Sequence, residues 1–225
     1  MEYNYKYLYS TMLKQIITSG FKYLDIDAYA CIIAYKELQG LKGVQSIALI
    51  KGVLNESITA TVKSWNAKYL SEIAINPEDE LIIMDTSDKE YLEKYFNLDQ
   101  IVKLYDHHFG YKDFWISRLG SNAIIENVGS CATLIWEEYT KSNLSSKIST
   151  LSANLIYTAI ISNTLNLKAQ ITSQRDIQAI QEVKSLISLP DNWNEIYFNE
   201  LGDSVNTNPS KAIKNDTKEM FINGE

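Results

Sequence analysis

The sequence predicts an α/β fold: a five-stranded, mostly parallel sheet with helices on both faces, followed by a mostly helical second half. Short apolar runs alternate with helical patterns through the first half, which is typical of parallel sheets. Longer apolar-rich segments with helical spacing fill the second half. The length of 225 residues suits one large domain. We expect this domain to occupy residues 1–205, with 206–225 forming a linker and the start of a second domain that is not present.

The five predicted strands are short segments rich in β-branched and other apolar residues. They lie at residues 15–19, 44–50, 80–85, 101–105 and 123–128. The spacing of apolar residues predicts helices after Asp25, over 58–70, over 88–96 and from Ser130 to about Tyr139. In the second half it predicts helices over 147–161, 173–188 and 192–205. Right-handed crossovers between the parallel strands would cover both faces of the sheet.

The composition argues against several classes of partner. The formal net charge is −7 and there is no Lys/Arg-rich run, which disfavours nucleic acid as a ligand. No apolar run reaches the ~18 residues of a membrane span, and the N-terminus lacks the features of a signal peptide. Cys31 and Cys131 lack metal-type spacing, so we interpret both as buried apolar residues of a reduced protein. We therefore expect a cytoplasmic location and no membrane partner.

The most informative stretch is Asp106-His107-His108, which contains both histidines of the chain. Histidine is the commonest metal ligand, and this pair follows the predicted strand 101–105. Asp25, Asp27 and Asp85 also follow predicted strands directly. Ligands of such folds bind at the carboxyl ends of parallel strands, which share one edge of the sheet. We therefore expect these acidic and imidazole groups to meet there.

Each of these features also has a simpler structural interpretation. The histidines could be exposed loop residues, and Asp25 or Asp27 could cap the following helix. Asp85 could begin a turn. Gly129-Ser130 could be a plain helix start, or its backbone amides could contact an anion. Lys218 could be a solvated surface charge.

Together, the carboxylates and imidazoles form an oxygen-rich ligand set that suits Mn²⁺ or Mg²⁺. The Asp-x-Asp spacing lets one loop present two carboxylates to neighbouring ions, and Asp85 could bridge ions about 3.5–4 Å apart. Such a site attacks phosphorus without a protein nucleophile. A small phosphate-rich substrate could bind despite the acidic net charge, because the ions supply positive charge.

The ordered motifs resemble those of the DHH phosphoesterases, which are named for the sequence seen here at Asp106-His107-His108. Within that superfamily, the chain is most similar to the N-terminal domain of the manganese-dependent (family II) inorganic pyrophosphatases. Asp25-Ile26-Asp27-Ala28 resembles the first family motif, Asp85 the second and Gly129-Ser130 the fourth. The segment 160–165 resembles the family's Ser-Asp-Thr segment.

The resemblance implies hydrolysis of a phosphoanhydride, with inorganic pyrophosphate as the expected substrate and Mn²⁺, Mg²⁺ or Co²⁺ as the cofactor. It implies that Asp25 and Asp27 each face one of two ions, that Asp85 bridges the pair and that His107 ligates a metal. The remaining implied roles are substrate binding by His108 and Lys218, catalysis by His108 and Asp85, and orientation of a histidine by Asp106. A homodimer is implied by the resemblance alone.

Two positions depart from the family pattern. Phe21 stands where the family has a metal-binding histidine, and Asn163 stands where it has a metal-binding aspartate. An amide oxygen can still bind Mn²⁺ but brings no charge, so one ion or none is an alternative to two. We therefore weigh a hydrolase with a degraded metal site against an impaired homologue that binds phosphate or metal in a regulatory role. An exopolyphosphatase or a nuclease-type DHH phosphoesterase is a third hypothesis, and the acidic net charge disfavours the nuclease.

Overall fold

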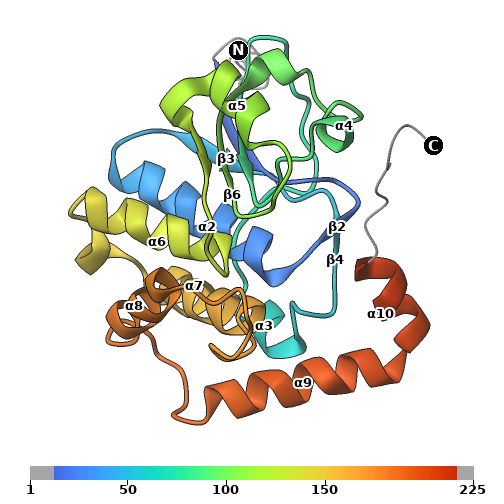
Figure 1. The fold of residues 1–225 in the computed structure, drawn as a ribbon, viewed down its shortest axis with the longest axis vertical. Helices are drawn as coiled ribbons and strands as arrows, with labels where there is room; N and C mark the ends of the chain where they lie inside the picture. Colours follow the sequence, from blue (N-terminus) through green and yellow to red (C-terminus); the bar gives the residue numbers. More distant parts are fainter. Residues whose placement is uncertain (1–12, 217–225) are drawn as a thin grey trace, which may run out of the picture.

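The structure of the chain is a computed structural model that describes residues 13–216. At its centre lies a five-stranded sheet in which every strand pairing is parallel. The strand order is β3-β1-β5-β6-β7 (Figure 1). The strands are β1 (Gln15–Thr18), β3 (Ser46–Ala48), β5 (Glu80–Met84), β6 (Ile101–Asp106) and β7 (Ala123–Ile125). The predicted five-stranded parallel sheet is confirmed.

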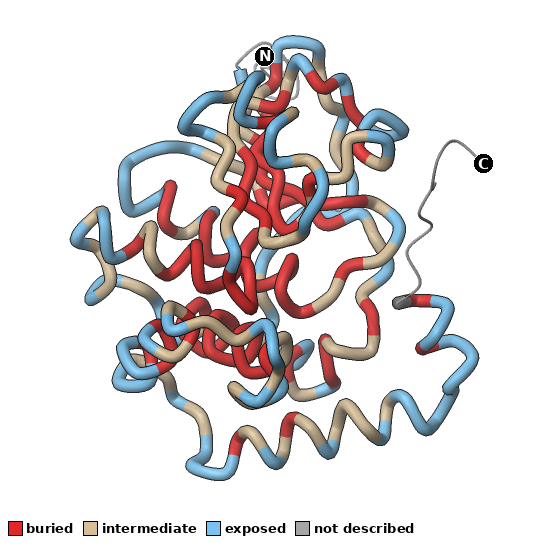
Figure 2. Tube along the Cα trace, in the orientation of Figure 1, coloured by how far each residue is buried: buried red, intermediate tan, exposed pale blue. Residues whose placement is uncertain are grey.

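Helices cover both faces of this sheet. Successive residues of a strand point to opposite faces, so Ile17 and Ile82 belong to one buried cluster and Ile16 and Leu81 to another. Apolar residues of three helices complete the first cluster: α2 (Ile26–Leu41), α6 (Cys131–Lys141) and α7 (Thr150–Asn163). The second cluster is closed by α4 (Lys89–Leu92) and α5 (Lys112–Leu119), which contributes the buried Trp115. The buried residues accordingly form a continuous interior around the strands (Figure 2).

The second half of the chain is helical, as predicted. α7 packs against α2 and α6, and α8 (Gln174–Val183) packs against α6 and α7. α9 (Trp193–Thr207) and α10 (Pro209–Asp216) run along the periphery, where exposed and half-buried residues dominate (Figures 1 and 2). Buried Trp193 and Tyr197 attach α9 to the body of the domain.

The helix predicted over 58–70 is much shorter than expected. α3 spans only Ala60–Ser64, and Asn66 follows it with a left-handed φ of 54°. The chain then becomes extended, and Leu70 forms a parallel bridge with Leu49 beside β3. Pairing with the edge of the sheet thus overrides the helical pattern of this segment.

Several elements differ from the sequence prediction in other ways. The short pair β2 (Tyr23–Leu24) and β4 (Val53–Leu54) was not predicted, nor was α5. The expected linker at 206–210 contains the end of α9 and the start of α10, with an extended break at Asn208. Lys218 lies outside the described residues.

Candidate functional site

Asp85 leaves the sheet through an unusual backbone turn. Its φ of 59° lies in the left-handed region, which is uncommon for residues other than glycine but accessible to aspartate. Its backbone N–H donates to the Tyr105 carbonyl at 2.8 Å and continues the pairing between β5 and β6. The turn places a carboxylate oxygen of Asp85 3.3 Å from Nε2 of His107.

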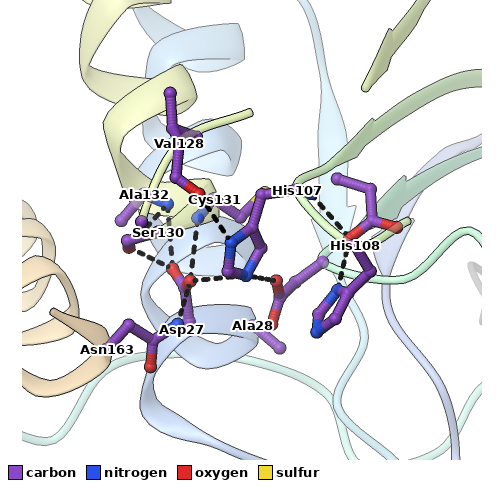
Figure 3. Close-up of polar contacts among 12 residues, drawn as sticks. Asp27, Ala28, His107, His108, Val128, Ser130, Cys131, Ala132 and Asn163 are labelled. Atoms are coloured by element: carbon purple, nitrogen blue, oxygen red, sulfur yellow. Dashed lines mark hydrogen bonds and ion pairs between the residues drawn. The ribbon is translucent and has the colours of Figure 1, made fainter. Parts of the chain in front are cut away.

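His107 faces one carboxylate from each of the first two motifs. Its Nδ1 donates to the Val128 carbonyl at 3.0 Å, which fixes the orientation of the ring. Nε2 therefore faces the carboxylates of Asp85, at 3.3 Å, and Asp27, at 3.6 Å (Figure 3). Burial opposes protonation of the ring, but the hydrogen bond and charge of Asp85, together with Asp27 and Asp106, raise the pKa of His107 to about 10. In the absence of metal, His107 is a cation paired with these carboxylates.

Asp106 orients the second histidine. It is the last residue of β6 and is buried. Its Oδ1 accepts hydrogen bonds from the backbone N–H of His107 at 2.8 Å and from Nδ1 of His108 at 2.7 Å. The His108 side chain is 41% exposed, and it lines the pocket described below. Asp106 thereby fixes the orientation of the His108 ring at the pocket.

Asp85, His107 and His108 form a group that suits a metal ion. Each offers one ligand atom, and these atoms lie within 4.8 Å of one another. One carboxylate and two imidazoles are a suitable donor set for Mn²⁺ and related divalent ions. We call this group the open half of the site, and its donors fit one ion.

Asp27 lies in the first turn of α2, but its carboxylate is enclosed by the start of α6 (Figure 3). Oδ1 accepts hydrogen bonds from the Ser130 hydroxyl at 2.9 Å and the Ala132 N–H at 2.8 Å. Oδ2 accepts from the Cys131 N–H at 2.8 Å and the Asn163 amide at 2.6 Å. A carboxylate has about four lone-pair positions, so these donors occupy its hydrogen-bonding capacity. We call Asp27 and these donors the closed half of the site.

Asn163 reaches Asp27 because α7 ends there. Residues 165–167 all adopt left-handed φ values, which turns the chain away after the helix. The nitrogen of the Asn163 amide faces Asp27. Burial and the charge on Asp85 raise the pKa of Asp27 to about 7, against the lowering effects of His107 and the Ala132 N–H. A second ion at Asp27 would have to displace donors that already contact both of its oxygens.

The start of α6 combines both alternatives proposed for Gly129-Ser130. Ser130 is a helix N-cap, and the amides of the next two residues bind an anion, which is Asp27 of the same chain. Asp176 braces this turn by accepting hydrogen bonds from the Gly129 N–H at 2.8 Å and the Thr133 hydroxyl at 2.6 Å. The sequence analysis assigned no role to Asp176, although its spacing from Ser173 is that of a capping box, which the structure contains.

Asp25 and Phe21 complete the set of predicted site residues. Asp25 is the N-cap of α2, where its Oδ1 accepts a hydrogen bond from the Ala28 N–H at 2.9 Å, and it also lines the pocket. The Phe21 ring packs instead among aromatic residues, with centroid distances of 4.8 Å to Phe96 and 5.4 Å to Tyr95. Phenylalanine offers no donor atom, so Phe21 does not supply the ligand that the first motif implies at this position.

A pocket of about 470 Å³ adjoins the open half of the site. Asp25, Asp85 and His108 lie along its wall, together with tyrosines from the α4 region and Asn215 of α10. Asn215 is held in place by hydrogen bonds from its amide to the Glu56 carboxylate at 3.0 and 3.2 Å. A ligand in this pocket would therefore have direct access to an ion at Asp85.

Comparison with known proteins identifies distant relatives that share one name. No protein-family model matches the chain. The chain is similar to proteins named probable manganese-dependent inorganic pyrophosphatase. The protein of Lactobacillus delbrueckii subsp. bulgaricus is 26% identical over 177 residues, covering 78% of this chain and 55% of the relative. That of Shouchella clausii is 29% identical over 173 residues, covering 74% and 53%. That of Lactobacillus gasseri is 24% identical over 222 residues, covering 95% and 68%.

The chain thus spans between about half and two thirds of the length of these relatives. Two solved structures share its fold. A candidate family II inorganic pyrophosphatase of Methanococcus jannaschii has a TM-score of 0.60 at 20% identity, covering 84% of this chain and 61% of that one. An exopolyphosphatase-related protein from Bacteroides fragilis has a TM-score of 0.63 at 15% identity, covering 88% and 58%. The likeness inferred from the motifs is confirmed. Within residues 13–216, no helix combines the length and apolarity needed to cross a membrane.

Proposed function

We propose that the protein is a divalent-metal-dependent phosphohydrolase that cleaves a phosphoanhydride bond, with inorganic pyrophosphate as its simplest substrate. The observation that carries the proposal is the open half of the site, in which the ligand atoms of Asp85, His107 and His108 lie within 4.8 Å of one another. These residues lie beside a pocket large enough for a phosphate compound. The names of the relatives support manganese as the ion.

Each residue of the open half has a distinct role in this proposal. Asp85 and His107 would hold the ion (Mn²⁺, Mg²⁺ or Co²⁺), and His107 must release its proton to do so. A bound divalent ion supplies positive charge that polarises a phosphoryl oxygen. His108 does not ligate the ion in this proposal: held by Asp106, it would donate a hydrogen bond to a phosphate oxygen and stabilise the charge that develops there. Lys218, expected to contact phosphate, lies outside the described residues, and its role stays a prediction.

The expected setting of the reaction is part of the same proposal. We place the protein in the cytoplasm, because both cysteines are free and buried, as is typical of proteins from reducing compartments. The substrate would be a small phosphate compound and not a nucleic acid, since the net charge is −7. The homodimer implied by the motifs also remains a prediction.

A second candidate function is a regulatory protein that binds phosphate or one ion without efficient turnover. The contact between Asn163 and Asp27 favours it, because this hydrogen bond of 2.6 Å occupies the place implied for a second ion. Two-ion sites stabilise both the attacking and the leaving oxygen of the displacement. A single ion lacks half of this effect.

Phosphate release from pyrophosphate in the presence of Mn²⁺ tests the proposal. We expect turnover by the unmodified chain and a loss of at least about 100-fold in Asp85→Ala. Asp79→Ala is the control, because Asp79 is also buried and precedes the same strand that Asp85 follows. Turnover that survives Asp85→Ala would overturn the metal-site assignment. An inert chain that still binds Mn²⁺ would establish the regulatory candidate instead.

A further inference from the structure

The pocket beside the open half of the site is wider than a small inorganic anion requires. Its volume is about 470 Å³, within the range of about 300–1,000 Å³ that holds drug-sized organic ligands. Pyrophosphate would occupy only the end next to Asp85 and His108. The rest of the pocket is lined by polar and charged residues and by several aromatic side chains, with Tyr91, Tyr95 and Tyr111 among them.

The aromatic wall is fixed in position before any ligand binds. The Tyr91 hydroxyl accepts a hydrogen bond from the Lys22 N–H at 3.0 Å. Its ring fills the space beside Gly20, where an added Cβ would lie 2.2 Å from a ring carbon. Tyr95 meets Tyr91 edge to face, with ring centroids 5.2 Å apart. Phe21 supports Tyr95 from behind, at 5.4 Å. A preorganised wall of this kind binds a planar ring with little loss of side-chain entropy.

Besides the aromatic wall, the pocket contains polar groups that could bind a phosphorylated sugar. Ser87 lines the pocket and is 2% exposed, and its hydroxyl has no hydrogen-bond partner within the described part of the chain. The Ser87 carbonyl accepts a hydrogen bond from the buried Trp115 indole at 2.7 Å, which fixes this loop. Lys22 and Lys94 also line the pocket, beside the carboxylates of Asp25, Asp85, Asp88 and Glu90, so the phosphates depend on the ion at Asp85 for most of their charge compensation. A buried hydroxyl that lacks a partner points to a polar ligand atom that completes it.

We infer that the pocket binds a nucleoside 5′-diphosphate, with its phosphates at Asp85 and His108 and its base against Tyr91 and Tyr95. This inference rests on the proposed function and specifies its substrate. In the reaction, the oxygen of one water molecule bonds to the terminal phosphorus, and the bond from that phosphorus to the bridging oxygen breaks. The bridging oxygen stays on the nucleoside monophosphate, inorganic phosphate is released, and the water proton passes to solvent. No oxidant or reductant is needed.

Titration calorimetry with two uncleavable probes tests the inference. The probes are α,β-methylene-ADP and methylenediphosphonate, which carry the same bridged phosphorus pair with and without a nucleoside. Both are titrated into the full chain with Mn²⁺. We expect the nucleotide to bind at least about tenfold more tightly, because stacking of a base on an aromatic side chain contributes that much. Equal affinities for the two probes would overturn the inference.

Tyr95→Ala tests whether the expected preference for the nucleotide probe comes from the aromatic wall, and Tyr69→Ala is its matched control. The two tyrosines are 39% and 37% exposed, each meets another tyrosine edge to face, and Tyr69 is not among the pocket residues. Tyr95→Ala should weaken nucleotide binding about tenfold and change diphosphonate binding less than twofold. Tyr95→Phe should keep the nucleotide affinity of the unmodified chain. Tyr69→Ala should change the affinity for neither probe. Equal losses for both probes in Tyr95→Ala, or no loss, would contradict the placement of the base.

Binding and turnover separate this inference from the proposed function. A chain that hydrolyses pyrophosphate but shows no preference for the nucleotide probe keeps the hydrolase and refutes the nucleoside pocket. A chain that binds the nucleotide through Tyr95 but releases no phosphate from ADP or pyrophosphate keeps the pocket and refutes the hydrolase.

Discussion

The two halves of the site lie at the same edge of the sheet, but their carboxylates differ in burial and in hydrogen bonding. In the closed half, Asp27 is fully buried and accepts four hydrogen bonds of 2.6–2.9 Å from the protein itself. In the open half, Asp85 and His108 face a pocket. A carboxylate in a motif typical of metal ligands can therefore have its oxygens occupied by hydrogen bonds from a helix N-terminus and a side-chain amide, without a metal ion.

The difference follows from what surrounds each carboxylate. A buried carboxylate is costly unless donors or cations compensate its charge. Asp27 is opposite the first turn of α6, where free backbone N–H groups and the helix dipole favour an anion. Asp85 instead follows a strand and lies at the pocket. Among the described residues it pairs with His107 at 3.3 Å, and a metal ion can replace the proton on that ring.

The largest expected effect tests the closed half through stability. Asp27→Ala would remove the carboxylate that accepts from the Ser130 hydroxyl, the Cys131 N–H and the Asn163 amide, and would leave the Ala132 N–H only its bond of 3.2 Å to the Ser130 hydroxyl oxygen. We expect the free energy of unfolding to fall by about 4 kcal/mol, measured by urea denaturation with EDTA present. Asp25→Ala is the control from the same motif, because it removes one helix cap and should cost about 1 kcal/mol. Equal costs for the two variants would contradict the comparison.

The next prediction concerns how the protonation of His107 makes the free energy of unfolding depend on pH. Asp85, Asp27 and Asp106 raise the pKa of this residue to about 10 in the folded protein, against the ordinary value of 6.5 that a histidine has in the unfolded chain. Between these values only the folded state holds the proton. The stabilisation is therefore complete below pH 6.5 and is lost as pH rises towards 10. We expect the free energy of unfolding in EDTA to fall over this window, with a slope of at most about 1.4 kcal/mol per pH unit.

His107→Gln should flatten this pH dependence, because it removes the group whose pKa is raised by Asp85, Asp27 and Asp106. An unchanged slope in His107→Gln would show that another group carries the dependence. Asp27 contributes with the same sign at lower pH, since burial raises its pKa from 3.8 to about 7 and the folded state retains the proton over that range.

A smaller effect tests whether the closed half can be reopened to metal. We expect the unmodified chain to bind one Mn²⁺, measured by equilibrium dialysis, and the double variant Phe21→His with Asn163→Asp to bind two. In Asn163→Asp alone, a second carboxylate replaces the amide beside Asp27. The metal-free protein should lose about 1 kcal/mol of stability through like-charge repulsion, and Mn²⁺ should restore more than this. Two ions in the unmodified chain would refute the closed half.

The sequence was sufficient to predict the sheet and the open half of the site. The alternation of buried strands with helices placed Asp85 and Asp106-His107-His108 at strand ends, and ends of parallel strands share an edge. The helix at 58–70 was predicted wrongly, because its outcome depends on the pairing of Leu70 with Leu49 and not on local spacing. The unpredicted pair β2 and β4 also joins segments that are distant in sequence.

The closed half could not be predicted because its donors are remote from Asp27 in the sequence. Ser130 is 103 residues away and Asn163 is 136 residues away. Which atom of the Asn163 amide faces the carboxylate depends on the packing of α7 against α2, and no sequence pattern specifies it. The role of Asp176 was missed for the same reason, since its partners Gly129 and Thr133 lie at the start of α6, 47 and 43 residues away in the sequence.

The smallest effect concerns how the open half positions His108. Asp106→Asn keeps the shape of the side chain but removes the negative charge that accepts the hydrogen bond from Nδ1 of His108. Partners that orient a functional histidine in this way contribute about 10–100-fold, and the 41% exposure of His108 places this one near the lower limit. We expect Mn²⁺-dependent phosphate release to fall about tenfold, with the Mn²⁺ stoichiometry unchanged. A loss of bound Mn²⁺ in Asp106→Asn would instead show that this carboxylate acts on the metal through His107, whose backbone N–H it also accepts.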